Sequence, residues 1–106
     1  MVAEPRLLVL DEPSAGLDLP SREALIAALQ RSVLERPELT VVLATHHLEE
    51  IPPSATHGAL LRDGCLMTSG PIEEALTREH LAACFGIEVE VSRHEGRWFG
   101  AARTYE

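Results

Sequence analysis

Two short, uninterrupted runs of apolar residues constrain the fold of this chain more than any other feature. They are residues 7–10, Leu-Leu-Val-Leu, and residues 41–44, Val-Val-Leu-Ala. A strand with one face in water alternates apolar and polar side chains, whereas a strand inside a covered parallel sheet is apolar throughout. We therefore expect the first run to form an interior parallel strand buried on both faces, with the second run as its parallel neighbour.

The segment between the two runs has the pattern of an amphipathic helix. Leu25, Leu29 and Val33 are spaced four residues apart, and Pro20 and Pro37 stand near the two ends of the segment. A helix of this length makes a connection long enough for parallel pairing of the flanking strands, and such crossovers are right-handed. The sequence therefore predicts a strand–helix–strand unit of the α/β class.

The second half of the chain predicts antiparallel hairpins and short helices. An Asp63-Gly64 pair between two apolar runs supplies the positive φ angles of a tight hairpin turn. Thr77 and Gly86 have the preferences of a helix N-cap and a helix stop. The expected elements are strands over 59–62 and 65–68, helices over 71–76 and 77–85, and a last hairpin over 87–91 and 97–101.

The composition disfavours several classes of function. The chain carries 9 basic and 17 acidic residues, for a formal net charge of -8, whereas proteins that bind nucleic-acid backbones need clustered positive charge. We therefore expect no nucleic-acid partner. Two isolated cysteines, Cys65 and Cys84, favour a reduced intracellular setting. No apolar run approaches the roughly 20 residues of a membrane span.

Polar residues follow both apolar runs, at the edge where open parallel sheets bind ligands. Asp11 and Glu12 come directly after the first run, and His46 follows the second. Successive side chains point in opposite directions, so Asp11 can face a metal ion while Glu12 faces a reacting water. His46 can hydrogen-bond a terminal phosphate oxygen or hold that water. Asp18, which closes the loop after the first run, can cap the helix or reach a partner subunit.

The stretch from Arg6 to Asp18, Arg-Leu-Leu-Val-Leu-Asp-Glu-Pro-Ser-Ala-Gly-Leu-Asp, resembles the Walker B strand, catalytic glutamate and D-loop of ABC-type ATPases. The tripeptide Ala-Thr-His that ends at His46 is similar to the switch-histidine loop of the same family. The resemblance continues with decreasing specificity to Gly86 and beyond. It implies a partial P-loop NTPase fold with antiparallel C-terminal hairpins, and ATP and Mg²⁺ as cofactors of the intact domain.

The resemblance also implies a role for each of the four residues after the strands. Asp11 would bind the magnesium ion, directly or through its waters, and Glu12 would polarise the attacking water. His46 would contact the γ-phosphate of ATP. Asp18 would help communication across a head-to-tail dimer of ATP-binding subunits. The chemistry is phosphoryl transfer to water, in which the protein mainly positions groups and stabilises charge.

The phosphate-gripping motifs of the family are not found in this sequence. A P-loop of the form G-x-x-x-x-G-K-[ST] needs a lysine, and all 9 basic residues here are arginines. The glutamine loop and the Leu-Ser-Gly-Gly segment are missing as well, since the single glutamine, Gln30, falls in the predicted helix. We therefore expect the C-terminal portion of an ATP-binding subunit from Walker B onward, with Met1 as an internal methionine or a late start.

This interpretation carries expectations for domains, activity and partners. Residues 1–85 would be the C-terminal part of an ATPase domain, and residues 86–106 a peripheral hairpin of a kind that resembles importers. The chain alone would be inactive. Its partners would be the missing N-terminal half, a second ATP-binding subunit and a transmembrane permease, with the assembly on the cytoplasmic face of the cell membrane. The alternative is a non-enzymatic fragment that associates with another ATPase subunit through an exposed sheet edge.

The polar cluster after the second run permits another interpretation. His46, His47, Glu49 and Glu50 together suggest a metal site. Adjacent histidine side chains point in different directions, however, whereas zinc ligands converge tetrahedrally. We therefore expect His47 to have no catalytic role, and Glu49 and Glu50 to lie on a solvated helix face.

Overall fold

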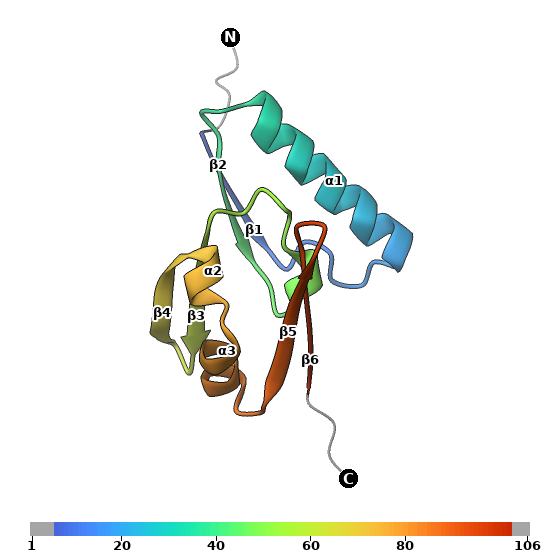
Figure 1. Cartoon of the computed structure of the whole chain (residues 1–106). Coiled ribbons are helices and arrows are strands. Elements are labelled where there is room, and N and C mark those ends of the chain that lie inside the picture. The colour runs from blue at the N-terminus through green and yellow to red at the C-terminus, as the bar shows by residue number, and fades with distance from the viewer. Residues whose placement is uncertain (1–5, 103–106) are drawn as a thin grey trace. The chain divides into compact units, whose positions relative to one another are not determined.

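The computed structural model describes residues 6–102. The chain divides into two compact units, Met1–Ser54 and Ala55–Glu106. Within the described residues, the first unit contains two strands, a long helix and one 3-10 turn, and the second contains four strands and two short helices (Figure 1). The boundary between these units falls after residue 54 of the sequence. The domain boundary expected after residue 85 remains a prediction.

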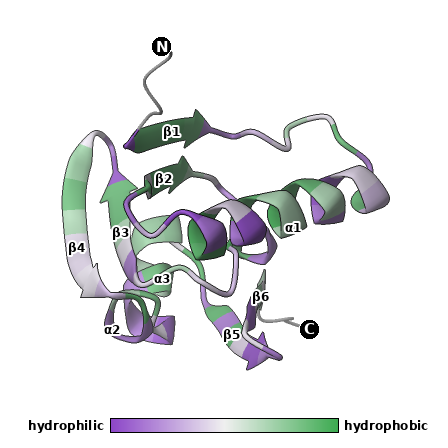
Figure 2. Ribbon diagram, turned by 90° about the horizontal axis from the view of Figure 1, so that it is seen from above, coloured by the Kyte–Doolittle hydropathy of each residue, from purple (hydrophilic) through white to green (hydrophobic). Residues whose placement is uncertain are grey.

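The first unit begins with the expected strand–helix–strand arrangement. Strand β1 spans Leu7–Asp11, helix α1 spans Leu19–Glu35 and strand β2 spans Thr40–Ala44. The strands pair in parallel along their whole length, and α1 lies to one side of them (Figures 1 and 2). A 3-10 turn, η1 (Leu48–Glu50), follows β2. The predicted α/β class and parallel pairing are confirmed.

The expectation that β1 is buried on both faces is wrong. Leu7 and Val9 are 57% and 63% exposed, and Val42 of β2 is 49% exposed, whereas Leu8 and Leu10 are half-buried. Both strands are mostly apolar, apart from Asp11 at the end of β1 and Thr40 at the start of β2 (Figure 2). Within residues 6–102, however, each strand has one strand neighbour, and one face of the pair is left without a covering layer. An aliphatic run permits burial on two faces but does not supply the second layer.

The core of the first unit is small. Helix α1 buries Ile26 and Leu29, and Leu39 is buried just before β2. The spacing of the two helix residues directs them to one face of the helix. The side chain of Gln30 on α1 accepts a hydrogen bond from the backbone N–H of Ser54 at 3.0 Å, so α1 also holds the end of the first unit.

The second unit opens with an antiparallel hairpin. Strand β3 spans His57–Arg62 and strand β4 spans Cys65–Pro71. The turn residues Asp63 and Gly64 have φ angles of 52° and 76°. These are the positive values that an Asp-Gly turn provides, and they confirm the predicted hairpin.

Two short helices follow the hairpin, α2 (Ile72–Ala75) and α3 (Arg78–Phe85). The side chain of Thr77 accepts a hydrogen bond from the backbone N–H of His80 at 3.1 Å, and Gly86 ends α3 with a left-handed φ of 76°. The predicted cap and stop are therefore confirmed. None of the helices within residues 6–102 is long and apolar enough to cross a membrane.

A second hairpin closes the described part of the chain. Strand β5 spans Val89–His94, strand β6 spans Arg97–Ala102, and the two are antiparallel. Their turn contains Glu95 and Gly96, both with positive φ angles of 50° and 80°. The predicted hairpin is present: β6 extends one residue beyond the predicted range 97–101, whereas β5 is shifted toward the C-terminus from the predicted range 87–91.

The core of the second unit is larger than that of the first. Leu81 of α3 is 0% exposed. Trp98 of β6 is 6% exposed, and the Arg93 guanidinium lies over its ring, 4.6 Å from the ring centroid. The apolar side chains buried in this unit are Ile72, Ala75, Leu76, Leu81, Val89 and Trp98.

Candidate functional site

The residues that follow β1 and β2 lie at the same edge of the parallel pair. The register places Asp11 opposite Ala44, and the backbone N–H of Glu12 donates to the carbonyl oxygen of Ala44 at 2.8 Å. The pairing therefore extends one residue beyond β1 and brings the segments after both strands together. This is the edge at which open α/β sheets bind ligands.

Glu12 and His46 make a side-chain contact at this edge, although 34 residues separate them in the sequence. The carboxylate Oε1 of Glu12 faces Nδ1 of the His46 ring. The two side chains are 39% and 79% exposed, so both remain open to a ligand. This is the pair of predicted site residues that the structure brings together.

The backbone of Glu12 is strained. Its φ of 48° is a left-handed conformation that costs a residue with a side chain about 1–2 kcal/mol. Two turns follow, in which the N–H of Ala15 donates to the carbonyl of Glu12 at 3.1 Å and the N–H of Leu17 to that of Ser14 at 3.0 Å. Strain of this kind often occurs at functional sites. Here it sets the direction in which the Glu12 carboxylate leaves the strand end.

Asp11, the last residue of β1, is exposed at the same edge. Mg²⁺ in nucleotide sites is usually bound through one or two carboxylates together with phosphates and water, and a single exposed carboxylate fits a site of that kind. Within residues 6–102 no group of three or more histidine, cysteine or acidic side chains could hold a metal ion. Asp11 thus offers one exposed carboxylate, and phosphate and water would have to supply the other ligands of a magnesium ion bound there.

Asp18 caps helix α1. Its Oδ1 accepts a hydrogen bond from the backbone N–H of Ser21 at 2.9 Å. Hydrogen bonding to Ser21, first to its side chain and then to its backbone N–H, lowers the pKa of the Asp18 carboxyl from its usual value of 3.8. Of the two roles considered for Asp18, the structure shows the helix cap, and the contact with a partner subunit stays a prediction.

Thr45 and Glu50 form a side-chain pair beside His46. The hydroxyl of Thr45 donates to Oε2 of Glu50 at 2.7 Å, and Glu50 is 8% exposed. The expectation that Glu50 lies on a solvated helix face is therefore wrong, because the 3-10 turn brings its side chain back to the end of β2. A hydroxyl residue at a strand end with an acid five residues later is the sequence signal that could have indicated this pair.

His46 and His47 have different partners. Nδ1 of His46 faces Glu12, whereas Nδ1 of His47 lies 3.8 Å from a carboxylate oxygen of Glu49. The same carboxylate oxygen also lies 4.0 Å from the guanidinium of Arg22 on α1. The two rings therefore do not converge on one point, and the segment after β2 is connected to the first turn of α1.

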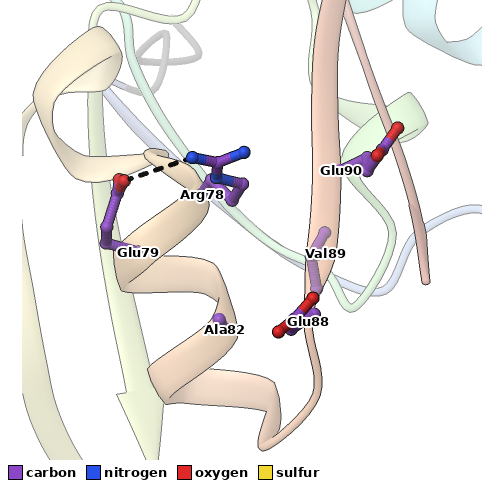
Figure 3. A pocket seen from close by; sticks show the side chains of 6 residues that line it. All are labelled: Arg78, Glu79, Ala82, Glu88, Val89 and Glu90. Atoms are coloured by element: carbon purple, nitrogen blue, oxygen red, sulfur yellow. Dashed lines mark ion pairs between the residues drawn. The ribbon is translucent and has the colours of Figure 1, made fainter. Parts of the chain in front are cut away.

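A surface groove in the second unit contains none of the predicted site residues. It lies between α3 and β5 and is lined by Arg78, Glu79, Ala82, Glu88, Val89 and Glu90 (Figure 3). Arg78 is ion-paired with Glu79 at 4.0 Å. With one arginine and three glutamates along its walls, the groove repels phosphate groups and does not suit a nucleotide.

The chain is similar to ABC transporter ATP-binding proteins. It is 36% identical over 99 residues to the uncharacterized ABC transporter ATP-binding protein YlmA of Bacillus subtilis, a match that covers 93% of this chain and 38% of YlmA. It is 40% identical over 113 aligned residues to the energy-coupling factor transporter ATP-binding protein EcfA of Methanoculleus marisnigri, covering 100% of this chain and 40% of EcfA. The molybdenum import ATP-binding protein ModC of Hahella chejuensis is 37% identical over 81 residues, covering 76% of this chain and 22% of ModC.

A solved structure has a similar fold. An ABC transporter in an inward-facing conformation matches with a TM-score of 0.69 and 26% sequence identity, over 90% of this chain and 38% of that one. No protein-family model matches the chain. The chain thus spans well under half the length of the curated relatives it matches, such as 38% of YlmA.

The parallel strand–helix–strand unit and the antiparallel hairpins form a partial P-loop NTPase fold. More narrowly, the chain belongs with the ATP-binding proteins of ABC transporters and corresponds to a part of their nucleotide-binding domain. These similarities confirm the family and the fold class inferred from the sequence.

Proposed function

We propose that this chain is the hydrolytic part of an ABC transporter ATP-binding subunit, which in complete form hydrolyses ATP to drive transport. The observation that carries the proposal is the contact between Glu12 and His46 at the shared edge of two parallel strands. A carboxylate and an imidazole in contact at this edge can accept a proton from a water molecule and donate a hydrogen bond to a phosphate oxygen. The similarity to YlmA and EcfA supports ATP as the substrate.

In this proposal Glu12 polarises the water that attacks the γ-phosphate. Its side chain is 39% exposed, so water and nucleotide can reach the carboxylate. A carboxylate that is held in place and close to the reacting water can accept its proton. Because phosphoryl transfer needs mainly positioning and charge stabilisation, the strained backbone of Glu12 serves the reaction by fixing where the carboxylate lies.

His46 contacts the terminal phosphate in the same proposal. Since Nδ1 faces Glu12, Nε2 is the ring nitrogen left for a phosphate oxygen. A protonated imidazole donates from both nitrogens, so His46 can connect the Glu12 carboxylate to the phosphate. Asp11 would hold the Mg²⁺ of the nucleotide, and that ion would neutralise phosphate charge. Asp18 would keep its capping role and also face a second subunit.

The proposal implies partners outside this chain. No lysine is present to form a P-loop, so we expect the isolated chain to be inactive and the phosphate-gripping part to come from an N-terminal half. The full assembly would be a head-to-tail dimer of ATP-binding subunits on a transmembrane permease, at the cytoplasmic face of the membrane. The similarity to the molybdenum import protein ModC favours an importer. Residues 1–85 would complete the ATPase domain and residues 86–106 would be peripheral.

Complementation tests this function. The chain is mixed with, or fused to, the N-terminal part of YlmA that it does not match, and ATP hydrolysis is measured. We expect no turnover above buffer from the chain alone, turnover from the combination, and a loss of about 100-fold or more with Glu12→Gln. Glu38→Gln is the matched control, because Glu38 is exposed and precedes β2, away from the site. Equal activity of the Glu12→Gln and Glu38→Gln combinations would contradict the proposal.

The exposed face of the β1–β2 pair favours a second candidate, a non-enzymatic fragment that associates with an ATPase subunit. Leu7, Val9 and Val42 are each about half exposed or more, and clustered apolar surface of this kind marks interaction sites. Size-exclusion chromatography with light scattering, at several concentrations, tests for association. Binding to the YlmA N-terminal part without any ATP turnover would favour this second function over the first.

A further inference from the structure

We propose that Thr45 and Glu50 are positioning residues that hold His46 against Glu12. This inference rests on the function proposed above, and it gives a positioning role to two residues to which the sequence analysis assigned none. His46 itself is 79% exposed, so packing does little to fix its ring. The position of the ring therefore depends on its contact with Glu12 and on the backbone that carries it.

That backbone is held on both sides of His46 by one hydroxyl. Thr45 immediately precedes His46, and its Oγ1 accepts a hydrogen bond from the backbone N–H of His47 at 3.1 Å. The same Oγ1 donates its proton to Oε2 of Glu50 at 2.7 Å. One hydroxyl thus accepts from the residue after His46 and donates to a carboxylate that is itself 8% exposed. A hydrogen bond to a charged acceptor is about twice as strong as a neutral one.

Glu50 is anchored in turn by the 3-10 turn. Its backbone N–H donates to the carbonyl of His47 at 3.1 Å, so Glu50 closes a ring of hydrogen bonds around residues 45–50. Glu49 of the same turn lies 4.0 Å from Arg22 on α1, which connects the turn to the helix. This ring of hydrogen bonds is therefore connected to α1, whereas the exposed His46 side chain projects from it.

The test uses the 106-residue chain and the ring signals of His46 in an NMR spectrum. We expect Glu12→Gln to change these signals, because the Glu12 carboxylate faces Nδ1. In a Thr45→Val background, which keeps the side-chain shape but lacks the hydroxyl, we expect the same Glu12→Gln change to have less than about half its effect. Thr45→Ser restores the hydroxyl and is expected to restore the effect.

Two further variants separate positioning from general damage. Glu50→Gln keeps an oxygen acceptor and is expected to retain the coupling, while Glu50→Leu removes the acceptor and is expected to lose it. Thr40→Val is the matched control, because Thr40 is an exposed threonine at the other end of β2. Far-UV circular dichroism of each variant checks that the fold is kept.

The outcomes decide the inference without any ATPase measurement. The inference would be overturned if Glu12→Gln changed the His46 ring signals in the Thr45→Val background as much as it does alone. It would also be overturned if Thr40→Val reduced that change as much as Thr45→Val does. The inference would also be overturned if Glu12→Gln, made alone, left the His46 ring signals unchanged, because there would then be no contact for Thr45 and Glu50 to maintain. In the complemented ATPase, Thr45→Val should lower kcat by about 10-fold with KM for ATP little changed. If complementation yields no activity but the NMR coupling behaves as expected, the proposed function fails and the positioning role stands.

Discussion

The two units of the chain differ in where the predicted site residues lie and in how many apolar side chains they bury. Among the described residues, the first unit contains all four predicted site residues but buries only Ile26, Leu29 and Leu39 of its apolar side chains. The second unit contains none of those site residues and buries an apolar core centred on Leu81 and Trp98. The unit that contains the candidate site residues is thus the one with the smaller apolar core, and it leaves Leu7, Val9 and Val42 of its two strands exposed. We therefore expect substitutions in the core of the second unit to lower stability more than substitutions on the exposed strand face of the first.

The largest expected effect contrasts a core residue of one unit with a strand residue of the other. Leu81→Ala should lower the free energy of unfolding by about 2–5 kcal/mol, because Leu81 is 0% exposed. Val9→Ala should change it by less than about 0.5 kcal/mol, because Val9 is 63% exposed. Urea unfolding followed by Trp98 fluorescence measures the first change, and far-UV circular dichroism the second. Equal losses in the free energy of unfolding for Leu81→Ala and Val9→Ala would contradict this difference between the two units.

A smaller effect tests the backbone of the second unit. Gly86 has a φ of 76° and a substituted Cβ would lie 3.7 Å from the Arg62 guanidinium, which is an ordinary contact. Gly86→Ala should therefore lower stability through backbone strain alone, by about 1 kcal/mol. Gly86→Asn, which tolerates this conformation better, should lose less. Trp98 fluorescence should report the change, and an unchanged midpoint for both variants would argue that the end of α3 adds nothing to this unit.

The helix cap of the first unit gives the next effect. Asp18→Ala should lower the melting temperature of α1 by a few degrees at pH 7, while Asp18→Asn should nearly preserve it. Because the folded-state pKa of Asp18 lies below 3.8, its stabilising contribution is present above that pH and is lost as the pH falls through the folded-state pKa. The gap between wild type and Asp18→Ala should shrink at pH 2. Melting followed at 222 nm checks this, and a gap that widens in acid would contradict it.

The smallest effect comes from an exposed ion pair in the second unit. Arg93 lies 2.8 Å from Glu73, and this hydrogen bond lowers the pKa of the Glu73 carboxyl. Since the Glu73 side chain is 65% exposed, Glu73→Gln should have a barely measurable effect that disappears at high salt. Arg93→Ala should cost more, because Arg93 also covers the Trp98 ring. A loss with Glu73→Gln as large as that with Leu81→Ala would show that the core does not dominate this unit.

Local signals predicted most of the fold. Thr77, Gly86 and the Asp63-Gly64 turn act within a few residues, so the sequence alone located the helix and hairpin that they define. The parallel pairing also followed from local patterns, because two aliphatic runs joined by a helix have few other solutions.

The features that the sequence did not predict depend on whether a second layer covers the strands and on hydrogen bonds between side chains. The exposure of Val9 could not be predicted because an aliphatic run looks the same whether its second face is covered or open. The burial of Glu50 was missed because it depends on a 3-10 turn and a hydrogen bond to Thr45. For the site, the strand-end rule indicated that Glu12 and His46 would lie together, but it says nothing of what holds His46 in place.

The left-handed backbone of Glu12 has a consequence for engineering. Glycine or asparagine would adopt a φ of 48° with less strain, so replacing Glu12 with either should make the chain more stable by up to about 1 kcal/mol. A laboratory screen that rewards heat resistance alone would therefore tend to discard the carboxylate. Stability and the proposed chemistry compete at this position, and a thermostable variant of this chain is best designed with residue 12 left untouched.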